Sequence, residues 1–461
     1  MSARRATGGR VERARPLGFR LEGRTLGGFA GDTLASALLA NGVQLLGRSF
    51  KYHRPRGLLS AGAEEPNGLL TIGEGARRTP NLPATMIELH EGLVCERQNG
   101  WPSVEYDAKA LLGALAPLLG AGFYYKTFMG PRRGSWMFYE PFIRRAAGLG
   151  RATHAPDPDR YETRDAHVDV LVIGSGPAGL AAARAAGRAG ARVLLVEQDF
   201  LLGGSLLRAP VDSPEEMLRG QLVADLADLH NVEIQTRTTA FGVYDGATVA
   251  LIERHEQARP DPDRGEARET LITVRARCIV HATGAIERPL VFGDNDRPGV
   301  LLADALRSYL NRHAIDFGAP ALIATNNDSA WRAAVDLAAA GTSVVLADER
   351  AVVAEPLLAA ARAQRIEVRL ATRLVRALGG RSLRGAELRR EGARNDERIP
   401  CRVIGMSGGW APTVHLTAHT GVRPRYDAAA GAHLPGSLPD GVWAAGACAG
   451  QGGRSLADGH A

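Results

Sequence analysis

The segment VDVLVIGSGPAGL, residues 168–180, decides the fold that this chain is expected to adopt. Its apolar run predicts a buried strand, and the glycines that follow fit the pattern GxGxxG. Gly174 permits a tight turn, Gly176 lets the backbone approach a pyrophosphate, and Gly179 lets the next helix pack closely on the strand. The N-terminus of that helix would offer free amides and a positive dipole end to phosphate. The candidate cofactor-binding residues of the turn are Gly174, Ser175, Gly176, Pro177, Ala178 and Gly179.

A second predicted strand, ARVLLVE, ends at Glu197, about twenty residues beyond the glycines. A carboxylate there accepts hydrogen bonds from ribose hydroxyls and repels a 2′-phosphate, so NADP is disfavoured. Gln198 and Gly204 complete the candidate residues of this segment. The ordered strand, glycine turn, helix, strand and acid predict a dinucleotide-binding Rossmann domain. A Rossmann unit that binds no ligand is the alternative.

Two later stretches are predicted strands that run into small residues, CIVHATGAIERPL at 278–290 and GVWAAGACAGQGG at 441–453. Small residues at strand ends permit close backbone approach to a ligand, although tight strand ends without a ligand look alike. Both stretches resemble motifs of two-dinucleotide-domain flavoprotein reductases, in which the chain leaves the first domain and later returns. His281 is expected to be a hydrogen-bonded structural residue. The candidate ligand-lining residues are Ala282, Thr283, Gly284 and Gly446.

Between these stretches, residues 320–350 predict a second strand–helix–strand unit. Its turn, TNNDS, contains asparagine instead of glycine, and an asparagine side chain obstructs approach to a pyrophosphate. Asp348 stands where a ribose-binding acid would stand. We expect this second domain to have lost ordinary nucleotide binding.

The composition is that of a globular protein with two or three domains: 461 residues, 45% hydrophobic and 23% charged, with a net charge of +6. Lys and Arg form no block with interleaved aromatics, which argues against nucleic-acid binding. No apolar run approaches the ~20 residues of a membrane span, and the basic N-terminus is followed by no signal-peptide core. A cytoplasmic location is expected. The predicted division is a tail (1–16), a small α+β domain (17–100), an aromatic-rich connector (101–165), a Rossmann domain (166–316 with 401–461) and an inserted Rossmann-like domain (317–400).

Three segments together resemble the alpha subunits of heterotetrameric sarcosine oxidases: residues 31–57, the glycine turn, and ATNNDSAWRAAVDLAAAG at 324–341. The resemblance runs from about residue 17 to the end. It implies that this subunit binds NAD and that a beta subunit carries FAD and FMN and oxidises sarcosine, with small subunits completing the complex. Oxygen is then reduced at the FMN near the alpha–beta interface. No redox partner is visible beside the NAD site, so NAD is expected to be structural. Such subunits carry a large folate-binding domain, which we expect to be absent from this one.

Related amine and opine dehydrogenase subunits carry a [2Fe–2S] ferredoxin-like domain where residues 17–100 stand. That cluster requires four thiolates. The loop LLSAGAEEPNGLLTIGEG, residues 58–75, contains no cysteine, and Cys95 is isolated. The predicted fold is therefore a Cys-less [2Fe–2S]-ferredoxin-like α+β domain followed by a two-dinucleotide-domain α/β body like those of flavoprotein reductases, and no metal site is expected. Within the small domain, Asp32 is expected to cap a helix that ends at Gly42.

The chain shows no catalytic constellation of its own. In the connector, YYKTF is similar to a segment that approaches the FMN site, and Lys126 is the candidate for electrostatic assistance to flavin or oxygen chemistry. Aromatic residues at this density more often pack at cores or interfaces. The basic cluster of residues 51–56, which includes His53 and Arg54, could bind a flavin phosphate or an interface carboxylate, or form a solvated loop.

Two other functions remain open at this stage. The chain could be a self-sufficient FAD-dependent amine oxidoreductase, in which case the glycine turn would hold FAD. It could also be a non-catalytic scaffold subunit that needs no nucleotide.

Overall fold

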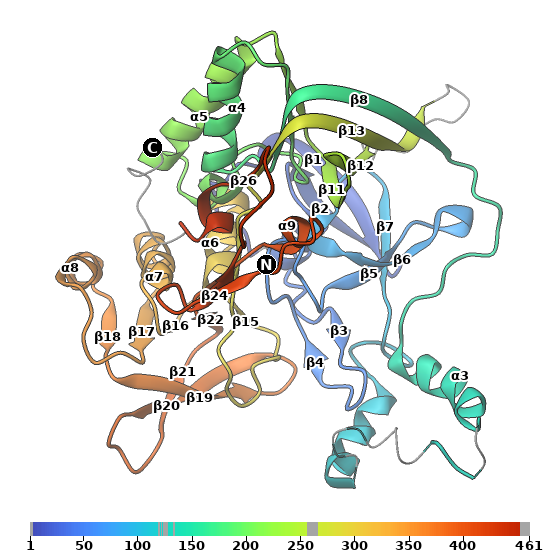
Figure 1. The fold of residues 1–461 in the computed structure, drawn as a ribbon. Coiled ribbons are helices and arrows are strands. Elements are labelled where there is room, and N and C mark those ends of the chain that lie inside the picture. Colours follow the sequence, from blue (N-terminus) through green and yellow to red (C-terminus); the bar gives the residue numbers. More distant parts are fainter. Residues whose placement is uncertain are drawn as a thin grey trace.

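The computed structural model describes residues 3–118, 120, 122, 128–131, 134–255 and 266–451. Figure 1 shows three sheet-based units, with the first dinucleotide-binding unit at the top, the second at the lower left and the N-terminal unit to the right of the second. Lys126 lies outside the described residues. Within the described part, no helix has both the length and the apolar character needed to cross a bilayer.

The N-terminal unit, called the ferredoxin-like unit below, is a five-stranded sheet in the order β2-β1-β7-β5-β6. Its helix packs all seven residues into the core, where apolar side chains provide most of the stabilisation. Asp32 is not the cap that the sequence suggested. Thr33 caps α1 by accepting a hydrogen bond from Ser36 N, while the Asp32 carboxylate pairs with Arg4 at 2.8 Å. The elements are β1 (Glu12–Leu21), β2 (Arg24–Ala30), α1 (Leu34–Ala40), β3 (Gly47–Arg48), β4 (Pro55–Arg56), β5 (Leu69–Ile72), η1 (Gly75–Arg77), β6 (Thr79–Pro83), η2 (Ala84–Met86) and β7 (Leu93–Arg97).

The connector contains η3 (Ala108–Leu118) and α3 (Trp136–Ala147). β8 begins at Arg160, inside the range expected to be connector, because its first half pairs in parallel with β13. β8 and β13 therefore run side by side along most of their length, as the top of Figure 1 shows, and β12 (Thr248–Arg254) pairs with the other edge of β13 over Glu269–Arg275.

The first dinucleotide-binding unit is a seven-stranded sheet in the order β10-β9-β8-β13-β12-β11, with β26 also paired to β13. The parallel pairing of β26 with β13 brings the C-terminal segment back to this sheet. Separate apolar cores cover its two faces. The elements are β8 (Arg160–Ile173), α4 (Pro177–Arg188), β9 (Val193–Val196), η4 (Gly204–Arg208), α5 (Pro214–Ala227), β10 (Val232–Gln235), β11 (Thr238–Tyr244), β12 (Thr248–Arg254), β13 (Ala267–His281) and β26 (Val442–Ala444).

The second dinucleotide-binding unit is a parallel sheet in the order β15-β22-β16-β17-β18, with a three-stranded antiparallel sheet beside it. Its strands β15 and β22 lie outside the range 317–400 that the sequence suggested for an inserted domain. The core of this unit is continuous with that of the ferredoxin-like unit. The elements are β15 (Val300–Leu302), α6 (Ala303–His313), β16 (Ala321–Thr325), α7 (Ser329–Ala339), β17 (Val344–Asp348), α8 (Glu355–Ala363), β18 (Glu367–Arg369), β19 (Thr372–Gly379), β20 (Leu383–Arg390), β21 (Glu397–Pro400) and β22 (Val403–Ser407).

Two short strands join the dinucleotide-binding units where the chain crosses between them. β14 (Ala285–Glu287) leaves the first unit and pairs antiparallel with β23 (Trp410–Pro412), which returns to it. This crossing places the carboxyl end of β13 close to the returning chain. The remaining elements are α9 (His415–Ala418), β24 (Arg425–Asp427), β25 (Ala432–Leu434) and η6 (Gly446–Ala449).

Candidate nucleotide-binding site

The predicted glycine turn joins β8 to α4, and two of its glycines have no room for a side chain. Gly174 has a φ of +100°, and a Cβ there would lie 2.5 Å from Ala282 O. A Cβ at Gly179 would lie 1.9 Å from Gly174 O, so the helix packs directly on the turn. Gly176 differs, because a Cβ there would meet no atom within 4 Å. The turn is therefore closed on the protein side and open at Gly176, as a backbone that approaches a phosphate requires.

The N-terminus of α4 faces this open side. Gly176 is its N-cap and Pro177 follows, and no side chain among the described residues caps the helix there. The first amides of a helix carry a partial positive charge and are available to an anion unless a side chain binds them. The end of α4 can therefore hold a negatively charged group beside Gly176.

Glu197, at the end of β9, binds the glycine turn directly. Its Oε2 accepts hydrogen bonds from Ser175 N at 2.8 Å and from Ser175 Oγ at 2.7 Å, and its Oε1 accepts one from Asp199 N at 3.0 Å. Burial raises the pKa of this carboxyl group. Oε1, with one described partner, retains a lone pair that can accept a hydroxyl donor.

Ser175, a candidate cofactor-binding residue of the turn, is also a structural link within the protein. Its Oγ donates to Glu197 and accepts from Gly203 N at 3.2 Å, and its side chain is fully buried. The hydroxyl therefore joins the turn, the acid and the loop before η4. The neighbouring Gly204 has a φ of +52°, and a Cβ there would lie 2.9 Å from Gly176 Cα. The predicted segments around 174–179, 197 and 204 are thus assembled into one site.

The segments at 282–284 and 446 reach the same place. Ala282 lies against Gly174, and a Cβ at Gly446 would lie 2.8 Å from the Ala178 side chain. Thr283 Oγ1 donates to Thr413 O at 2.8 Å, which fixes the turn after β13. For the two further candidates, a Cβ at Gly284 would meet no atom within 4 Å, and Gln198, two residues after the end of β9, is exposed.

The sequence did not indicate an ion pair that forms next to Glu197. Arg312 of α6 forms two contacts with the Asp199 carboxylate, at 2.5 and 2.8 Å, and its guanidinium lies 4.8 Å from the centre of the Phe200 ring. Arg312 is 6% exposed. The pair joins the second dinucleotide-binding unit to the loop that follows Glu197. Its two members are 113 residues apart, so no local pattern indicates it.

In the second unit, the position of the expected ribose-binding acid is filled by neighbouring side chains. Asp348 is fully buried and accepts hydrogen bonds from Trp331 Nε1 at 2.9 Å and from Arg350 Nε and Nη2 at 3.0 and 2.8 Å. In the preceding turn, Asn327 Nδ2 donates to Ser407 Oγ at 3.1 Å. The Asp348 carboxylate is thus occupied by partners within the chain, and the loss of ordinary nucleotide binding by this unit stays a prediction.

His281 contradicts the expectation of a hydrogen-bonded structural histidine. The ring is fully buried at the end of β13, and neither ring nitrogen has a hydrogen-bond partner among the described residues. Burial alone lowers its pKa to about 4. The imidazole is therefore held neutral beside the turn at 282–284.

Acidification is expected to destabilise the protein through His281. In the unfolded chain His281 is protonated near its ordinary pKa of about 6.5, whereas in the folded protein its pKa is about 4. The unfolded state therefore binds more protons between these two pH values, and the free energy of unfolding falls as the pH drops through this range. Between pH 7 and pH 5 the loss attributable to this residue is about 2 kcal/mol. Urea unfolding of the wild type and of His281→Leu at both pH values measures it. Equal losses in the two proteins would contradict the assignment.

The basic cluster at 51–56 binds groups within this chain instead of forming a solvated loop. Arg54 contacts the carboxylates of Asp294 and Asp296, each at 2.6 Å. His53 is 1% exposed, and its Nδ1 lies 2.6 Å from the Asp107 carboxylate. These contacts tie the ferredoxin-like unit to the second unit and to the connector.

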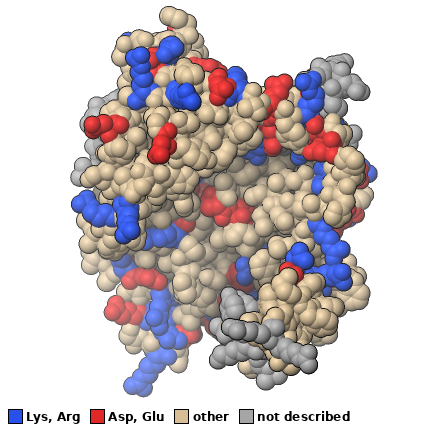
Figure 2. Space-filling model, turned by 45° about the vertical axis from the view of Figure 1, so that its right-hand side comes forward, with Lys and Arg blue, Asp and Glu red and all other residues tan. Residues whose placement is uncertain are grey.

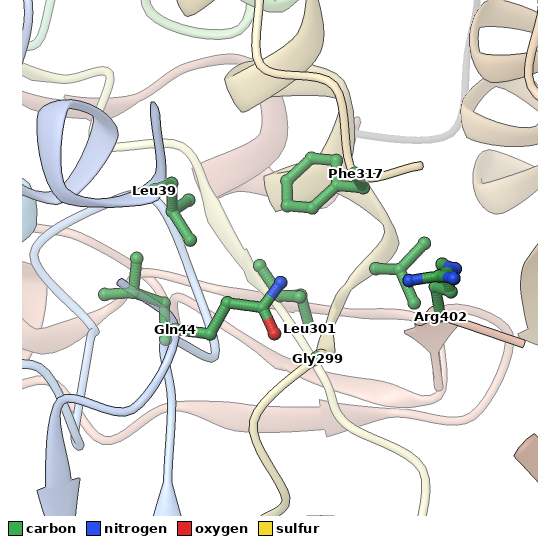
Figure 3. A pocket seen from close by; sticks show the side chains of 8 residues that line it. Leu39, Gln44, Gly299, Leu301, Phe317 and Arg402 are labelled. Atoms are coloured by element: carbon green, nitrogen blue, oxygen red, sulfur yellow. The ribbon is translucent and has the colours of Figure 1, made fainter. Parts of the chain in front are cut away.

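A separate pocket lies at the junction of the ferredoxin-like and second units. Figure 3 shows Leu39 and Gln44 facing Leu301, Phe317 and Arg402 across it. Its volume of about 10 Å³ is the room that one water molecule needs. The pocket is too small for a nucleotide, and none of its lining residues belongs to the glycine turn.

Comparison with known proteins identifies relatives of both halves of the fold. Residues 14–100 match the 2Fe-2S iron-sulfur cluster binding domain family, and residues 169–258 match the FAD dependent oxidoreductase family. The chain is 48% identical over 440 residues to the sarcosine oxidase subunit alpha of Rhizobium meliloti (strain 1021), a match that covers 93% of this chain and 43% of that subunit. It is 34% identical over 458 residues to that of Corynebacterium sp. (strain U-96), covering 94% and 42%. The chain spans about two fifths of the length of these curated relatives.

Among solved structures, the crystal structure of L-proline dehydrogenase from P. horikoshii aligns with a TM-score of 0.60 and 19% identity, covering 95% of this chain and 72% of that chain. At this identity the likeness concerns the fold alone. Together these comparisons confirm the predicted fold class and the resemblance to sarcosine oxidase alpha subunits.

Proposed function

This chain is a homologue of sarcosine oxidase alpha subunits, and from that premise we propose that it is the NAD-binding alpha subunit of a sarcosine-oxidase-like complex. The complex would oxidatively demethylate sarcosine with flavins on a partner subunit and oxygen as the acceptor. The similarity along nearly the whole chain carries this proposal, because it includes the ferredoxin-like unit and both dinucleotide-binding units.

The residues around the glycine turn fit a dinucleotide. In the proposal, the open side of Gly176 and the end of α4 hold the pyrophosphate, and Glu197 accepts hydrogen bonds from a ribose. A 2′-phosphate would meet the Glu197 carboxylate, which disfavours NADP. Thr283 and Gly284 line the far side. The bound NAD contributes binding energy to the fold, while the flavins on the partner supply the redox chemistry.

The connector is the proposed place of contact with the flavin-bearing beta subunit. Several of its large apolar side chains are exposed, and clusters of this kind mark interaction surfaces. On the face drawn in Figure 2, basic and acidic side chains are interspersed, which suits a protein partner better than a polyanion such as nucleic acid. We propose that FMN lies at this interface and that Lys126 assists the chemistry there. The exposed residues are Trp101, Tyr106, Leu111, Leu115, Met129, Met137, Phe138 and Phe142.

A self-sufficient FAD-dependent amine oxidoreductase is the second candidate. The match of residues 169–258 to the FAD dependent oxidoreductase family favours it, because the same glycine turn and acid bind the ADP half of FAD. In that case the chain would carry its own flavin and would need no beta subunit for the chemistry.

Identification of the bound nucleotide distinguishes the two candidates. The complex is purified under native conditions, its subunits are separated, and each is denatured and analysed by liquid chromatography and mass spectrometry. The proposal expects about one NAD per alpha chain and flavin on the partner alone. A yellow alpha chain that releases FAD would establish the second candidate, and a chain without nucleotide would overturn both.

A further inference from the structure

One buried carboxylate organises the loop between β4 and β5. Glu65 is 3% exposed and accepts four backbone hydrogen bonds from this loop. Its Oε2 accepts from Leu59 N at 2.8 Å and Ser60 N at 2.7 Å, and its Oε1 accepts from Asn67 N at 2.8 Å and Gly68 N at 2.9 Å. Each oxygen therefore binds one side of the loop.

Four backbone N–H groups that converge on one point form a nest for an anion, an arrangement found at many phosphate and iron–sulfur sites. Burial raises the pKa of Glu65, while the four N–H groups act in the opposite direction by favouring the charged form. Hydrogen bonds to an ionised acceptor are about twice as strong as neutral ones. The geometry is thus that of an anion site whose anion belongs to the chain itself.

The ferredoxin-like unit matches a cluster-binding domain but does not fit the cluster. Cys95 is the single cysteine between residues 14 and 100, and a [2Fe–2S] cluster needs four thiolates. Burial raises the pKa of the Cys95 thiol to about 12, and its Sγ donates to Arg20 O at 3.4 Å. The described residues contain no group of three or more His, Cys, Asp or Glu side chains placed to hold a metal ion.

The loop that Glu65 organises also contacts the second dinucleotide-binding unit. Leu59 O accepts from Leu302 N at 2.8 Å, at the end of β15, and Ser60 O accepts from the hydroxyl of Tyr309, in α6, at 2.9 Å. The N–H of Ser60 and the carbonyl of Leu59 belong to one planar peptide group, so Glu65 also fixes the carbonyl that accepts from Leu302 N, and Ser60 O follows in the next peptide group.

We propose that the Glu65 carboxylate is a built-in anion that fills the amide nest of this loop in a domain that has lost its iron–sulfur cluster. The loop it organises serves as the docking contact of the ferredoxin-like unit on the second dinucleotide-binding unit. The domain is thereby converted from an electron carrier to a structural support for the body that holds the nucleotide site.

Hydrogen exchange of the full chain tests the proposal at the four amides. Glu65→Ala is expected to increase the exchange rates of Leu59, Ser60, Asn67 and Gly68 at least tenfold. Glu65→Gln replaces one oxygen by an NH₂ group, so one pair of amides should lose protection while the other keeps it. The matched control is Glu64→Ala, which removes the same charge from the exposed neighbouring residue and should change nothing.

Chemical rescue separates an anion site from a residue that only fills space. Sodium formate should restore protection to Glu65→Ala in a saturable manner, whereas formamide, its neutral analogue, should not. Unchanged exchange in both Glu65 variants would overturn the proposal, as would equal rescue by formate and formamide. If Glu65→Ala does not fold, Glu65→Gln decides the point through its one-sided loss. Iron and sulfide at one cluster per chain after anaerobic reconstitution of the wild type would also overturn it.

Discussion

Gly176→Asp is expected to empty the nucleotide site while leaving the fold intact. A side chain at this position meets no protein atom within 4 Å, and the backbone φ of −62° is accessible to any residue, so the substitution is tolerated structurally. The new carboxylate would occupy the space proposed for the pyrophosphate. Juxtaposed like charges cost several kcal/mol, and about 3 kcal/mol corresponds to a loss of affinity of more than 100-fold. The measurement is the NAD content per chain after purification, together with titration of added NAD.

Gly220→Asp is the control for this variant. Gly220 is exposed within α5 and also has free space around it, so the same chemical change is made away from the site. That variant should retain the wild-type nucleotide content and stability. If Gly176→Asp also keeps its NAD, the pyrophosphate does not lie against Gly176 and the proposed site is wrong.

The glycine turn was predictable from the sequence because its physical requirements are local. Gly174 and Gly179 have no space for a side chain, and Glu197 follows at the spacing that one helix and one strand impose. The difference in the second unit is equally local, because Asn327 stands in its turn instead of a glycine and brings a side chain that donates a hydrogen bond to Ser407. Such features depend on a few residues close together in the chain.

The sequence could not indicate which distant side chains would meet. Arg54 was a candidate for flavin phosphate, yet its partners are Asp294 and Asp296, about 240 residues away. His281 was expected to form hydrogen bonds, but the strand pairing on both sides of β13 leaves its ring in an apolar environment. These outcomes depend on how the sheets pack, and a pattern within one segment contains no information about that.

Local competition explains a smaller difference at the first helix. Asp32 and Thr33 are both good capping residues, and the sequence favoured the acid. The structure uses Thr33 because Ser36 completes a reciprocal capping box, which leaves the Asp32 carboxylate for Arg4. The cap therefore depends on Ser36 in the first turn of the helix, and Asp32 binds Arg4, which is far from it in the sequence.

Arg312→Met is expected to lower the free energy of unfolding by about 2–3 kcal/mol, less than the ~3–5 kcal/mol of a fully buried ion pair, because the Asp199 side chain is 28% exposed to water. Asp199 would keep its charge without its bidentate partner, and the packing of the guanidinium on Phe200 would also be lost. Because Asp199 N donates to Glu197, movement of this loop should weaken nucleotide retention as well. Urea unfolding and the NAD content measure the two effects.

Arg332→Met provides the matched control, because the Arg332 side chain is largely exposed and its contact with the Glu215 carboxylate is long, at 4.0 Å. Exposed pairs contribute about 0–1 kcal/mol, so this variant should unfold like the wild type. Combining Arg312→Met with Asp199→Asn should recover part of the lost stability, since the second change removes the uncompensated charge. If Arg312→Met and Arg332→Met have the same stability, the buried pair does not join the two dinucleotide-binding units energetically, and the nucleotide site is supported by the first unit alone.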